Sequence, residues 1–312
     1  MSINVQWMCA GGAMDFNWDD MRVFLAIAQT GRLSAAGRRL GVSHTTVARR
    51  LRDLEARLGI SLFDHGENGL TLSEAGQVIL NQARGMERAA STITDRLSAM
   101  SGRAAGRVRV GAPDGFGNAI LSRLLPELLQ NEPDLEVELV PVPITHKLWR
   151  RDVDIAISLD RPERGRLIMR KLTDYDLRLY AGAGFWDRHG GTQPTALEDL
   201  KTLPFVGYID DLLYTPELDF NRILMPGLRI VYKAATVKAQ VDAVAANVGL
   251  GVLPCFMADD DLVPVLPDDI RFTRTYWLLY PEDYRDLERI RRVADFIHTR
   301  VQAMSDVMAY RG

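Results

Sequence analysis

Residues 33–76 read LSAAGRRLGVSHTTVARRLRDLEARLGISLFDHGENGLTLSEAG, and this stretch decides the fold of the N-terminal part of the chain. A short helix that ends near Leu40 runs into a turn at Gly41, and a second helix opens at Ser43. The apolar side of the second helix carries Val47, Leu51 and Leu54. Two helices joined in this way form a helix-turn-helix, whose second helix can lie in the major groove of DNA.

The other side of the second helix carries small, polar and basic side chains that suit contact with DNA. Hydroxyl, imidazole and guanidinium groups can reach base edges and phosphates. We therefore predict that this face and the residue that opens the helix contact the duplex, with the candidates Ser43, His44, Thr45, Thr46, Ala48, Arg49 and Arg52.

The helix-turn-helix lies in a basic stretch of a weakly acidic chain. The whole sequence has 38 basic and 41 acidic side chains, whereas residues 31–58 hold seven arginines against Asp53 and Glu55, a net charge of plus five. A local basic face in a nearly neutral protein is typical of duplex binding. The alternative is a solvated helix surface in an arginine-rich chain, but the coincidence of the arginines with the turn favours DNA.

The composition is that of a soluble protein of about two or three domains, with 312 residues, 47% hydrophobic and 25% charged. No apolar run approaches the ~20 residues that cross a bilayer, so we expect no membrane partner and a cytoplasmic location. Residues 1–13 are a poor secretory signal and are predicted to be a disordered leader, with Met14 as an alternative start. Cys9 and Cys255 do not make a disulfide framework; a buried thiol is the default for Cys255, with a redox role left open.

Residues 15–72 are predicted to form a winged helix-turn-helix. Gly59 ends the third helix, and residues 61–73 form two short strands around a glycine-containing turn, which is a wing. A long helix then runs from its N-cap, Ser73, to about Met100, and residues 73–101 are assigned to this linker helix.

Apolar residues recur along the linker helix in alternating steps of four and three. This heptad seam predicts a coiled coil between two copies of the chain, with an interface that contains Ile79, Met86, Ile93 and Leu97. The alternative is a helix packed on its own domain, but a small winged domain has little apolar surface to cover it. Two recognition helices held by a paired helix would read an interrupted palindrome in double-stranded DNA.

After a small-residue hinge at 101–107 the pattern changes to strands alternating with helices. This change predicts an α/β domain with a largely parallel sheet over residues 107–304. The predicted strands are 107–110, 135–140, 153–158, 176–181, 205–208, 229–233, 251–253 and 276–280, and the predicted helices are 119–130, about 145–150, 236–248 and 286–304.

Motifs in both parts of the chain resemble those of the LysR-type transcriptional regulators. The strings VDIAI at 153–157 and VAANVGLGVLP at 244–254 sit where the family's effector domain has similar ones. The family's N-terminal pattern is present with its spacing intact at Phe24, Ala35, Ala36, Leu40, Ser43, Val47, Leu54, Glu55, Leu58, Gly59, Leu62, Phe63, Leu72, Ala75 and Gly76.

The resemblance implies a multidomain α/β protein: a winged helix-turn-helix, a long linker helix and a two-lobed effector domain like a periplasmic binding protein. Lobe I would span about 107–160 and 271–304, and lobe II about 163–270. It implies a transcriptional regulator rather than an enzyme, with no cofactor, a homodimeric or homotetrameric assembly, a small-molecule effector between the lobes and action on RNA polymerase. It places base contacts on His44, Thr45, Ala48 and Arg49, and a phosphate contact on Ser34.

The sequence departs from the family pattern in the wing and at one recognition position. His65 and Asn68 stand where the family usually has arginine, and His44 stands where it usually has glutamine. His65 remains a candidate DNA contact, but two permanent charges are lost. Since each phosphate contact steepens the salt dependence of binding, we expect a weaker electrostatic contribution than in relatives.

Three segments meet the conditions for an effector cleft, because they follow strands or open a helix. They lie at 113–118, 208–210 and 236–237, and the candidate effector contacts are Asp114, Phe116, Tyr208, Ile209, Thr236 and Val237. Thr236 would cap a helix whose free N–H groups suit an acceptor on the ligand. Asp114 would face it, repel a simple anion and favour a cationic or hydroxylated group.

Other chemistries fit poorly. GAPDGFGNAI at 111–120 resembles a dinucleotide-binding turn, but Ile120 occupies the third glycine position. The five histidines are scattered, no metal site is predicted, and the acidic run 259–261 is better explained as a solvated loop. A ligand-binding protein of the periplasmic type without DNA function is the second hypothesis, and the winged helix argues against it. The effector, the operator and the choice between activation and repression stay open.

Overall fold

The computed structural model describes residues 5–6, 15–66, 69–100, 104–141, 153–162, 165–213 and 215–310. The chain divides into two compact units, Met1–Thr94 and Asp95–Gly312. At the start of the first unit, β1 (Val5–Gln6) pairs antiparallel with β2 (Asp15–Phe16). Val5 and Gln6 therefore form a paired strand, whereas the sequence predicts an unstructured chain for 1–13. The pairing satisfies backbone polar groups of these residues. The rest of the predicted leader lies outside the described residues.

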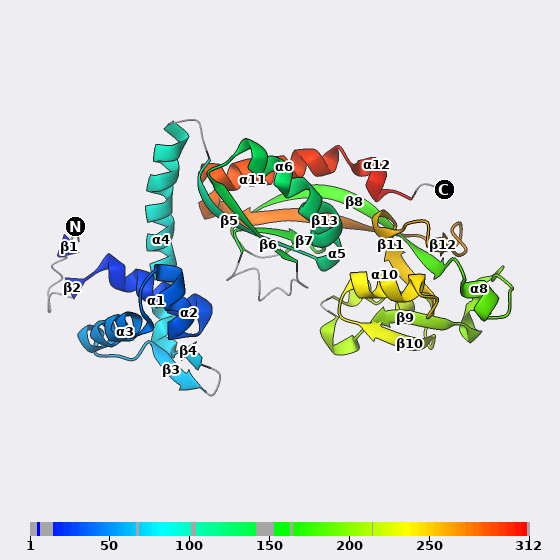
Figure 1. The fold of residues 1–312 in the computed structure, drawn as a ribbon, viewed down its shortest axis with the longest axis horizontal. Coiled ribbons are helices and arrows are strands. Elements are labelled where there is room, and N and C mark those ends of the chain that lie inside the picture. Colours follow the sequence, from blue (N-terminus) through cyan, green and yellow to red (C-terminus); the bar gives the residue numbers. More distant parts are fainter. Residues whose placement is uncertain are drawn as a thin grey trace. The chain divides into compact units, whose positions relative to one another are not determined.

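Three helices build the N-terminal unit: α1 (Trp18–Thr30), α2 (Leu33–Leu40) and α3 (His44–Leu58) (Figure 1). Each ends at a glycine in the left-handed conformation, with φ of 65° at Gly31, 68° at Gly41 and 67° at Gly59. The predicted turn at Gly41 and stop at Gly59 are thus confirmed. The apolar faces meet in a core that includes Met21, Phe24, Ile27, Ala36, Val47, Leu51, Leu54 and Leu62.

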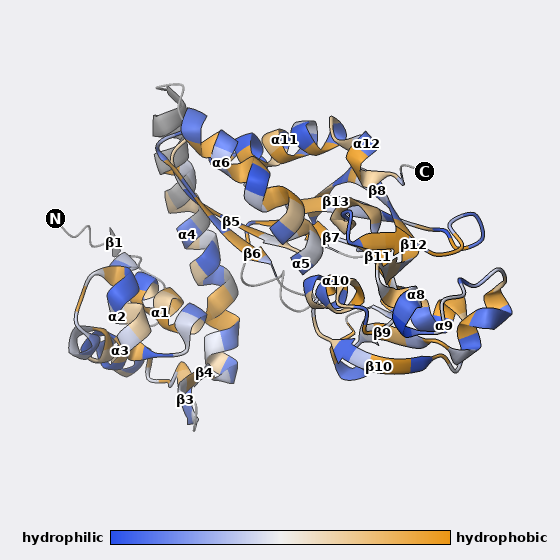
Figure 2. Cartoon of the chain, turned by 45° about the vertical axis from the view of Figure 1, so that its right-hand side comes forward, coloured by the Kyte–Doolittle hydropathy of each residue, from blue (hydrophilic) through white to orange (hydrophobic). Residues whose placement is uncertain are grey.

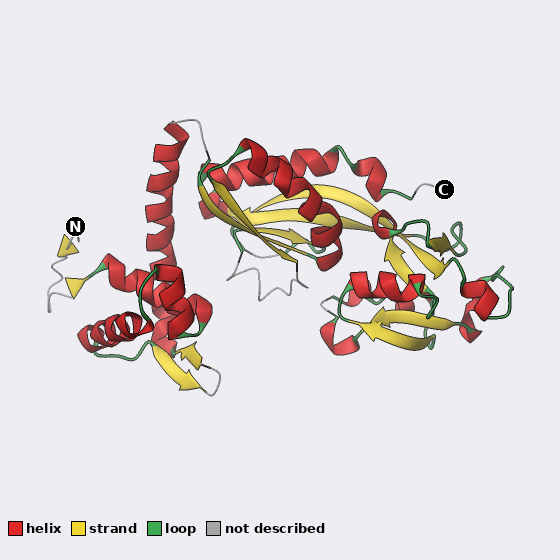
Figure 3. Ribbon diagram, in the orientation of Figure 1, coloured by secondary structure: helices red, strands yellow, loops and turns green. Residues whose placement is uncertain are grey.

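The wing consists of β3 (Phe63–Gly66) and β4 (Gly69–Leu72), an antiparallel pair that Figure 3 shows beside the helices. The N–H of Leu70 donates to the Gly31 carbonyl at 2.8 Å, which ties the wing to the turn after α1. A Cβ on Gly69 would lie 2.5 Å from the same carbonyl oxygen, so this approach requires glycine. Of the two departures from the family pattern in the wing, His65 is exposed on β3 and Asn68 lies outside the described residues.

The long helix α4 (Glu74–Met100) begins at the predicted cap, since the Ser73 Oγ accepts from the Gly76 N–H at 3.1 Å. Leu80 and Ala83 are buried in the core of the N-terminal unit, and Ile79 and Met86 are half-buried against it. Farther along, Ile93 is 63% exposed. The first half of the helix therefore packs on its own domain, whereas the seam near Ile93 is uncovered. The side chain of Leu97 lies outside those described.

The C-terminal unit is built on a large sheet in the order β11-β8-β13-β7-β5-β6, with β12 added beside β8. The strands are β5 (Gly106–Ala112), β6 (Leu135–Pro141), β7 (Ile155–Ser158), β8 (Leu167–Gly182), β11 (Gly251–Pro254), β12 (Leu262–Pro264) and β13 (Phe272–Pro281). Only β5, β6 and β7 pair in parallel; β8 and β13 run antiparallel along ten residue pairs. The prediction of a largely parallel sheet is wrong here, because β8 pairs antiparallel with β11, β12 and β13, and β13 pairs antiparallel with β7.

Helices cover the large sheet. After β5 the chain forms α5 (Asp114–Phe116), a π-helical turn (Gly117–Leu121) and α6 (Ser122–Asn131). Helix α6 contacts α11 (Glu288–Gln302), which also packs on β5 and β8, and the short α12 (Ser305–Met308) packs on β8. Figure 2 shows apolar residues along these strands and on the helix faces toward them. The core includes Val108, Val110, Phe116, Ile155, Leu172, Ile290 and Ile297.

A smaller layer stands apart from the large sheet within the same unit. It contains the parallel pair β9 (Pro204–Tyr208) and β10 (Arg229–Ala234), with the short helices α8 (Phe185–Arg188) and α9 (Phe220–Leu224). Helix α10 (Val237–Ala245) packs on β9, β10 and β11. This arrangement places the ends of β5 and β9 and the start of α10 in one region.

The end of α10 differs from the prediction. The helix stops at Ala245, not Val248, because Asn247 adopts φ of 63° and the Val248 N–H donates to the Ala243 carbonyl at 3.1 Å. This is a Schellman-type end with asparagine in the glycine position. Val248 is 37% exposed rather than buried. Gly249 is instead needed for packing, since a Cβ there would lie 2.9 Å from the Pro204 carbonyl. The predicted helix at 145–150 lies outside the described residues.

Candidate functional site

The face of α3 that carries the predicted DNA contacts is open. His44, Thr45, Arg49 and Arg52 are exposed, and Thr46 and Ala48 are half-buried beside them. Val47, Leu51 and Leu54 are buried on the opposite side. The helical period thus separates a core face from a polar face that is free to enter a groove.

Ser43 opens this face as the helix cap. Its Oγ accepts from the Thr46 N–H at 3.2 Å and lies 2.8 Å from the Thr45 hydroxyl. The first turn of α3 therefore presents exposed hydroxyls at the positive end of the helix dipole, an arrangement that suits a phosphate. Ser34, the predicted phosphate contact on α2, is also exposed.

Arg57 does not belong to the open face. Its guanidinium forms an ion pair with Asp20 of α1, whose carboxylate is nearly buried. Burial raises the pKa of Asp20, and the neighbouring Arg57 partly offsets this. One of the seven arginines counted in the basic stretch is thus used to hold α1 to α3, so the charge available to DNA is smaller than the sequence count.

Glu55 also has a structural role. Its Oε1 accepts from the Leu62 N–H at 2.7 Å, and the Ser73 Oγ donates to the Ser61 carbonyl at 2.7 Å. A Cβ on Gly76 would lie 2.2 Å from the Leu62 carbonyl oxygen. These contacts fix the entry to the wing between α3 and α4. They give a physical reason for the glutamate and the glycine at these two positions of the sequence.

In the C-terminal unit, Asp114 and α10 meet directly. The Asp114 Oδ2 accepts from the Val237 N–H at 3.0 Å and from the Lys238 N–H at 3.5 Å. Asp114 is 4% exposed, and burial raises the pKa of its carboxyl while the backbone donors act to lower it. A Cβ on Gly115 would lie 2.5 Å from the Val237 side chain, so glycine permits this approach. The expectation that Asp114 faces an open helix end across a gap is wrong, because the carboxylate itself occupies that end.

A narrow cavity, which we call the cleft, lies beside this contact. Of the predicted effector residues, Asp114, Tyr208 and Val237 line it. Phe116 does not: its ring is fully buried in the core, 4.4 Å from the Tyr276 ring centroid. Ile209 and Thr236 do not line it either. The Ile209 N–H donates to the Ala234 carbonyl, and the Thr236 Oγ1 caps α10 by accepting from the Ala239 N–H at 3.4 Å.

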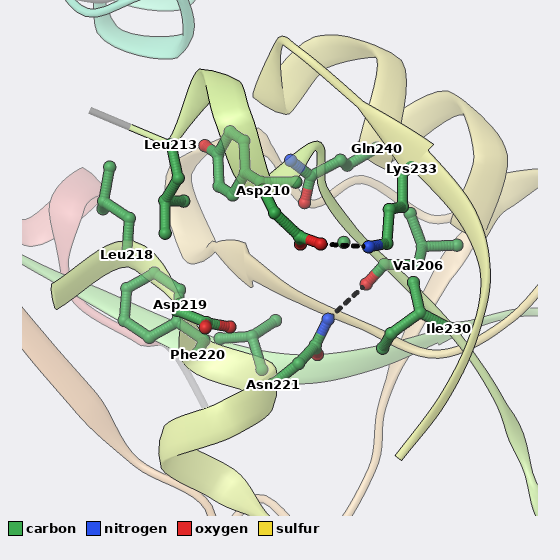
Figure 4. A pocket seen from close by; sticks show the side chains of 13 residues that line it. Val206, Asp210, Leu213, Leu218, Asp219, Phe220, Asn221, Ile230, Lys233 and Gln240 are labelled. Carbon is green, nitrogen blue, oxygen red and sulfur yellow. Dashed lines mark hydrogen bonds and ion pairs between the residues drawn. The ribbon is translucent and has the colours of Figure 1, made fainter. Parts of the chain in front are cut away.

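A second cavity, which we call the side pocket, lies on the β9–β10 layer (Figure 4). Tyr208, Leu218, Phe220 and Val252 line both cavities. The Lys233 Nζ pairs with Asp210 at 2.6 Å, and the Asn221 Nδ2 donates to the Val206 carbonyl at 3.0 Å. Gln240 is 3% exposed, and its Nε2 has no hydrogen-bond partner in the structure.

Sequence reasoning missed the aromatic wall of the cleft. Tyr175 and Tyr276 come from β8 and β13, and their rings stack with centroids 4.3 Å apart. The β13 strand was predicted over 276–280, but its pairing partner was not recognised. Phe220 comes from the segment between β9 and β10, for which no element was predicted. Phe220 opens α9, and a helix of five residues is too short to leave a periodic apolar pattern, so the sequence does not predict this wall.

Cys255 is a half-buried free thiol at the end of β11. Burial raises the pKa of this thiol, which lies beside the Tyr180 hydroxyl. Among the described residues no group of three His, Cys, Asp or Glu side chains is placed to hold a metal ion. The described helices likewise include none that is long and apolar enough to cross a membrane.

Two family descriptions match the chain. Residues 18–77 match the bacterial regulatory helix-turn-helix proteins of the lysR family, and residues 101–302 match the LysR substrate binding domain. Together these matches cover the chain from α1 to the first turn of α4 and nearly all of the C-terminal unit, and they leave residues 78–100 of α4 between them.

Named relatives align along almost the whole chain. The Mau operon transcriptional activator of Paracoccus denitrificans is 31% identical over 90% of this chain and 95% of the relative. The transcriptional activator TtdR of Escherichia coli K12 is 24% identical over 89% and 91%.

Solved structures share the fold. Full-length OxyR C199D from Pseudomonas aeruginosa has a TM-score of 0.68 at 19% identity, and the alignment covers 90% of this chain and 97% of that one. Full-length CbnR complexed with its target DNA has a TM-score of 0.57 at 19% identity, with 92% and 100% covered.

Proposed function

The chain belongs to the LysR family of transcriptional regulators, and from this premise we propose how its parts divide the work. It carries the family's helix-turn-helix and its substrate binding domain. We assign 15–72 to DNA binding, 73–101 to dimerisation and 107–304 to effector binding, with lobe I at about 107–160 and 271–304 and lobe II at about 163–270. The alternative of a ligand-binding protein without a regulatory role is set aside, because the named relatives are transcriptional regulators and activators.

The open face of α3 carries the proposed DNA contact. His44, Thr45, Thr46, Ala48, Arg49 and Arg52 enter the major groove, Ser43 and Ser34 hold phosphates, and His65 lies along the backbone from the wing. The observation that supports this most is the capped helix start with exposed hydroxyl, imidazole and guanidinium groups above a buried Val47. A solved relative of the same fold is complexed with its target DNA.

A homodimer supplies two such helices, and the interface includes the uncovered Ile93 together with parts of Ile79 and Met86 that the winged domain leaves exposed. We assign Leu97 to the same interface from its place in the heptad pattern of the sequence. A homotetramer would pair two dimers. The operator is an interrupted palindrome, because two-fold protein symmetry is matched by two half-sites.

A small molecule in the cleft sets the output of the regulator through RNA polymerase. Tyr208 and Val237 line the cleft and contact the effector, with Tyr175, Tyr276 and Phe220 as further walls. Such a cavity, mostly apolar with a few polar groups, is typical of a ligand site. Phe116 supports the cleft as part of the core, and Thr236 supports it as the N-cap of α10.

The test combines DNA capture with a ligand panel. Purified protein is mixed with fragments of its own genome, including the region upstream of its own coding sequence, and bound fragments are identified by gel shift. Tyr208→Ala is then compared with wild type in a metabolite panel. We expect specific fragments to shift in both proteins and one metabolite to alter only the wild-type shift. Binding of all fragments with equal affinity would contradict the proposal.

A further inference from the structure

The N-terminus of α10 already holds an anion that belongs to the chain. The Asp114 Oδ2 lies 3.0 Å from the Val237 nitrogen and 3.5 Å from the Lys238 nitrogen, and the Thr236 Oγ1 caps the next free donor at Ala239. The first-turn donors of a helix are the groups that bind carboxylates and phosphates. In this cleft they are satisfied from within the fold.

The other described residues that line the cleft and the side pocket offer no free cation. Their acidic members are Asp114, Asp210 and Asp219, and their one basic member, Lys233, is paired with Asp210 at 2.6 Å. A carboxylate that entered the cleft would meet Asp114, and one that entered the side pocket would meet Asp219 beside the paired Asp210 and Lys233. By contrast, the buried Gln240 amide lies beside the Tyr208 hydroxyl, and its Nε2 donates no hydrogen bond of normal geometry, which suits an uncharged oxygen on a ligand (Figure 4).

We propose that Asp114 is a built-in carboxylate ligand of α10, and that the cleft therefore excludes small carboxylates and admits an uncharged or cationic effector. This rests on the proposed function, in which the cleft is the effector site. The buried carboxylate links α5 to the start of α10. Removing the Asp114 side chain would leave a cavity of carboxylate size beside the Val237 and Lys238 N–H groups, which would then lack an acceptor.

The test is whether a free carboxylate can bind at the start of α10 once the Asp114 side chain is removed. Wild type, Asp114→Ala, Asp114→Asn and Asp260→Ala are melted in sodium acetate and in sodium chloride of equal ionic strength, with acetamide as the uncharged analogue. Asp260→Ala removes an exposed carboxylate from the same unit and controls for net charge. We expect a saturable rise in Tm of a few degrees with acetate in Asp114→Ala only. Asp114→Asn keeps the place filled and should not respond.

An equal response to acetate in wild type, in Asp114→Asn or in Asp260→Ala would overturn the proposal, as would no response in a folded Asp114→Ala. If Asp114→Ala does not fold in chloride, refolding from urea in acetate takes the place of the melt. Recovery in acetate and not in acetamide supports the proposal, and failure of both Asp114→Ala and Asp114→Ser to recover in acetate overturns it.

The role of Asp114 and the effector role of the cleft are tested by different outcomes. If acetate restores Asp114→Ala but no metabolite changes operator binding of wild type, the assignment of Asp114 stands and the effector role of the cleft falls. If a carboxylate metabolite controls wild type and Tyr208→Ala abolishes that control, the effector role stands and the exclusion of carboxylates falls.

Discussion

Two arginines of α3 have different roles although they are the same type of residue. Arg49 is exposed on the open face, whereas Arg57 pairs with the nearly buried Asp20. Arg49→Ala should weaken specific DNA binding by about 1–3 kcal/mol if the side chain contacts a guanine edge, and should leave Tm unchanged. The measurement is a footprint titration with a parallel thermal melt.

Arg57→Ala is the matched control. It should lower the free energy of unfolding by roughly 1–3 kcal/mol, because it leaves the Asp20 carboxylate buried without its partner. The DNA affinity of the folded fraction should change little. Equal losses of affinity in the two variants would show that the assignment of the open face is mistaken.

Asp114 gives a prediction in pH. Burial raises the pKa of its carboxyl above the ordinary 3.8, so the folded chain binds this proton more tightly than the unfolded chain. The contribution of this group to the free energy of unfolding therefore falls as the pH rises from 3.8 through the raised pKa of the folded state. Asp114→Asn keeps an acceptor for α10 and cannot ionise, so its Tm should exceed that of wild type at neutral pH. The gap should shrink as the pH falls toward 4; melts that show it widening in acid would contradict the sign.

Some residue roles were predictable from the sequence and others were not. The alternation of buried and open positions on α3 follows from the helical period, and the Ser43 cap follows from residue type and place. The Arg57–Asp20 pair joins positions far apart in sequence, so no local pattern announces it. The sequence marks Asp114 as unusual but predicts a ligand as its partner, because the approach of α10 that Gly115 permits depends on the tertiary structure.

At the element scale, α4 combines two roles that a heptad pattern alone does not separate. Ile93 is exposed, so Ile93→Glu should preserve the Tm of the monomer unit and abolish the dimer, since like charges would be buried across the pair. Light scattering measures the oligomer and gel shift the DNA binding. A dimer of wild-type mass would place the interface elsewhere.

Met86→Glu is the comparison on the same helix. Met86 packs partly on the core of the N-terminal unit, so a carboxylate there should lower Tm as well as weaken the dimer. The seam was visible in the sequence. Its division into a part packed on its own domain and an uncovered part was not, because that depends on where the winged core ends.

The start of α10 depends on two caps with different sources. Thr236→Val removes the hydroxyl that accepts from the Ala239 N–H and should cost about 1 kcal/mol of stability. Thr236→Ser keeps the hydroxyl and should remain near wild type. The effector response should weaken in the valine variant only, measured with a promoter reporter once an effector is found. A full response in the valine variant would separate the helix start from the ligand site.

At the scale of the whole molecule, the class of the fold was predictable and the order of its strands was not. Alternating strand and helix patterns indicate an α/β domain, and β5, β6 and β7 are the parallel strands that this predicts. The antiparallel run of β8 against β13 brings together segments about a hundred residues apart, and half of β8 was not predicted at all. The Tyr175–Tyr276 wall of the cleft is formed by those two strands, so it could not be predicted without their pairing.

The central claim is that two copies of this chain read one operator through α3. Hydroxyl-radical footprinting of the full-length protein on a captured fragment tests it most directly. We predict two protected half-sites of inverted sequence, separated by one or more turns of about 10 base pairs, with both protections weakened together in Arg49→Ala. A single protected site, or protection that Arg49→Ala leaves intact, would contradict the account.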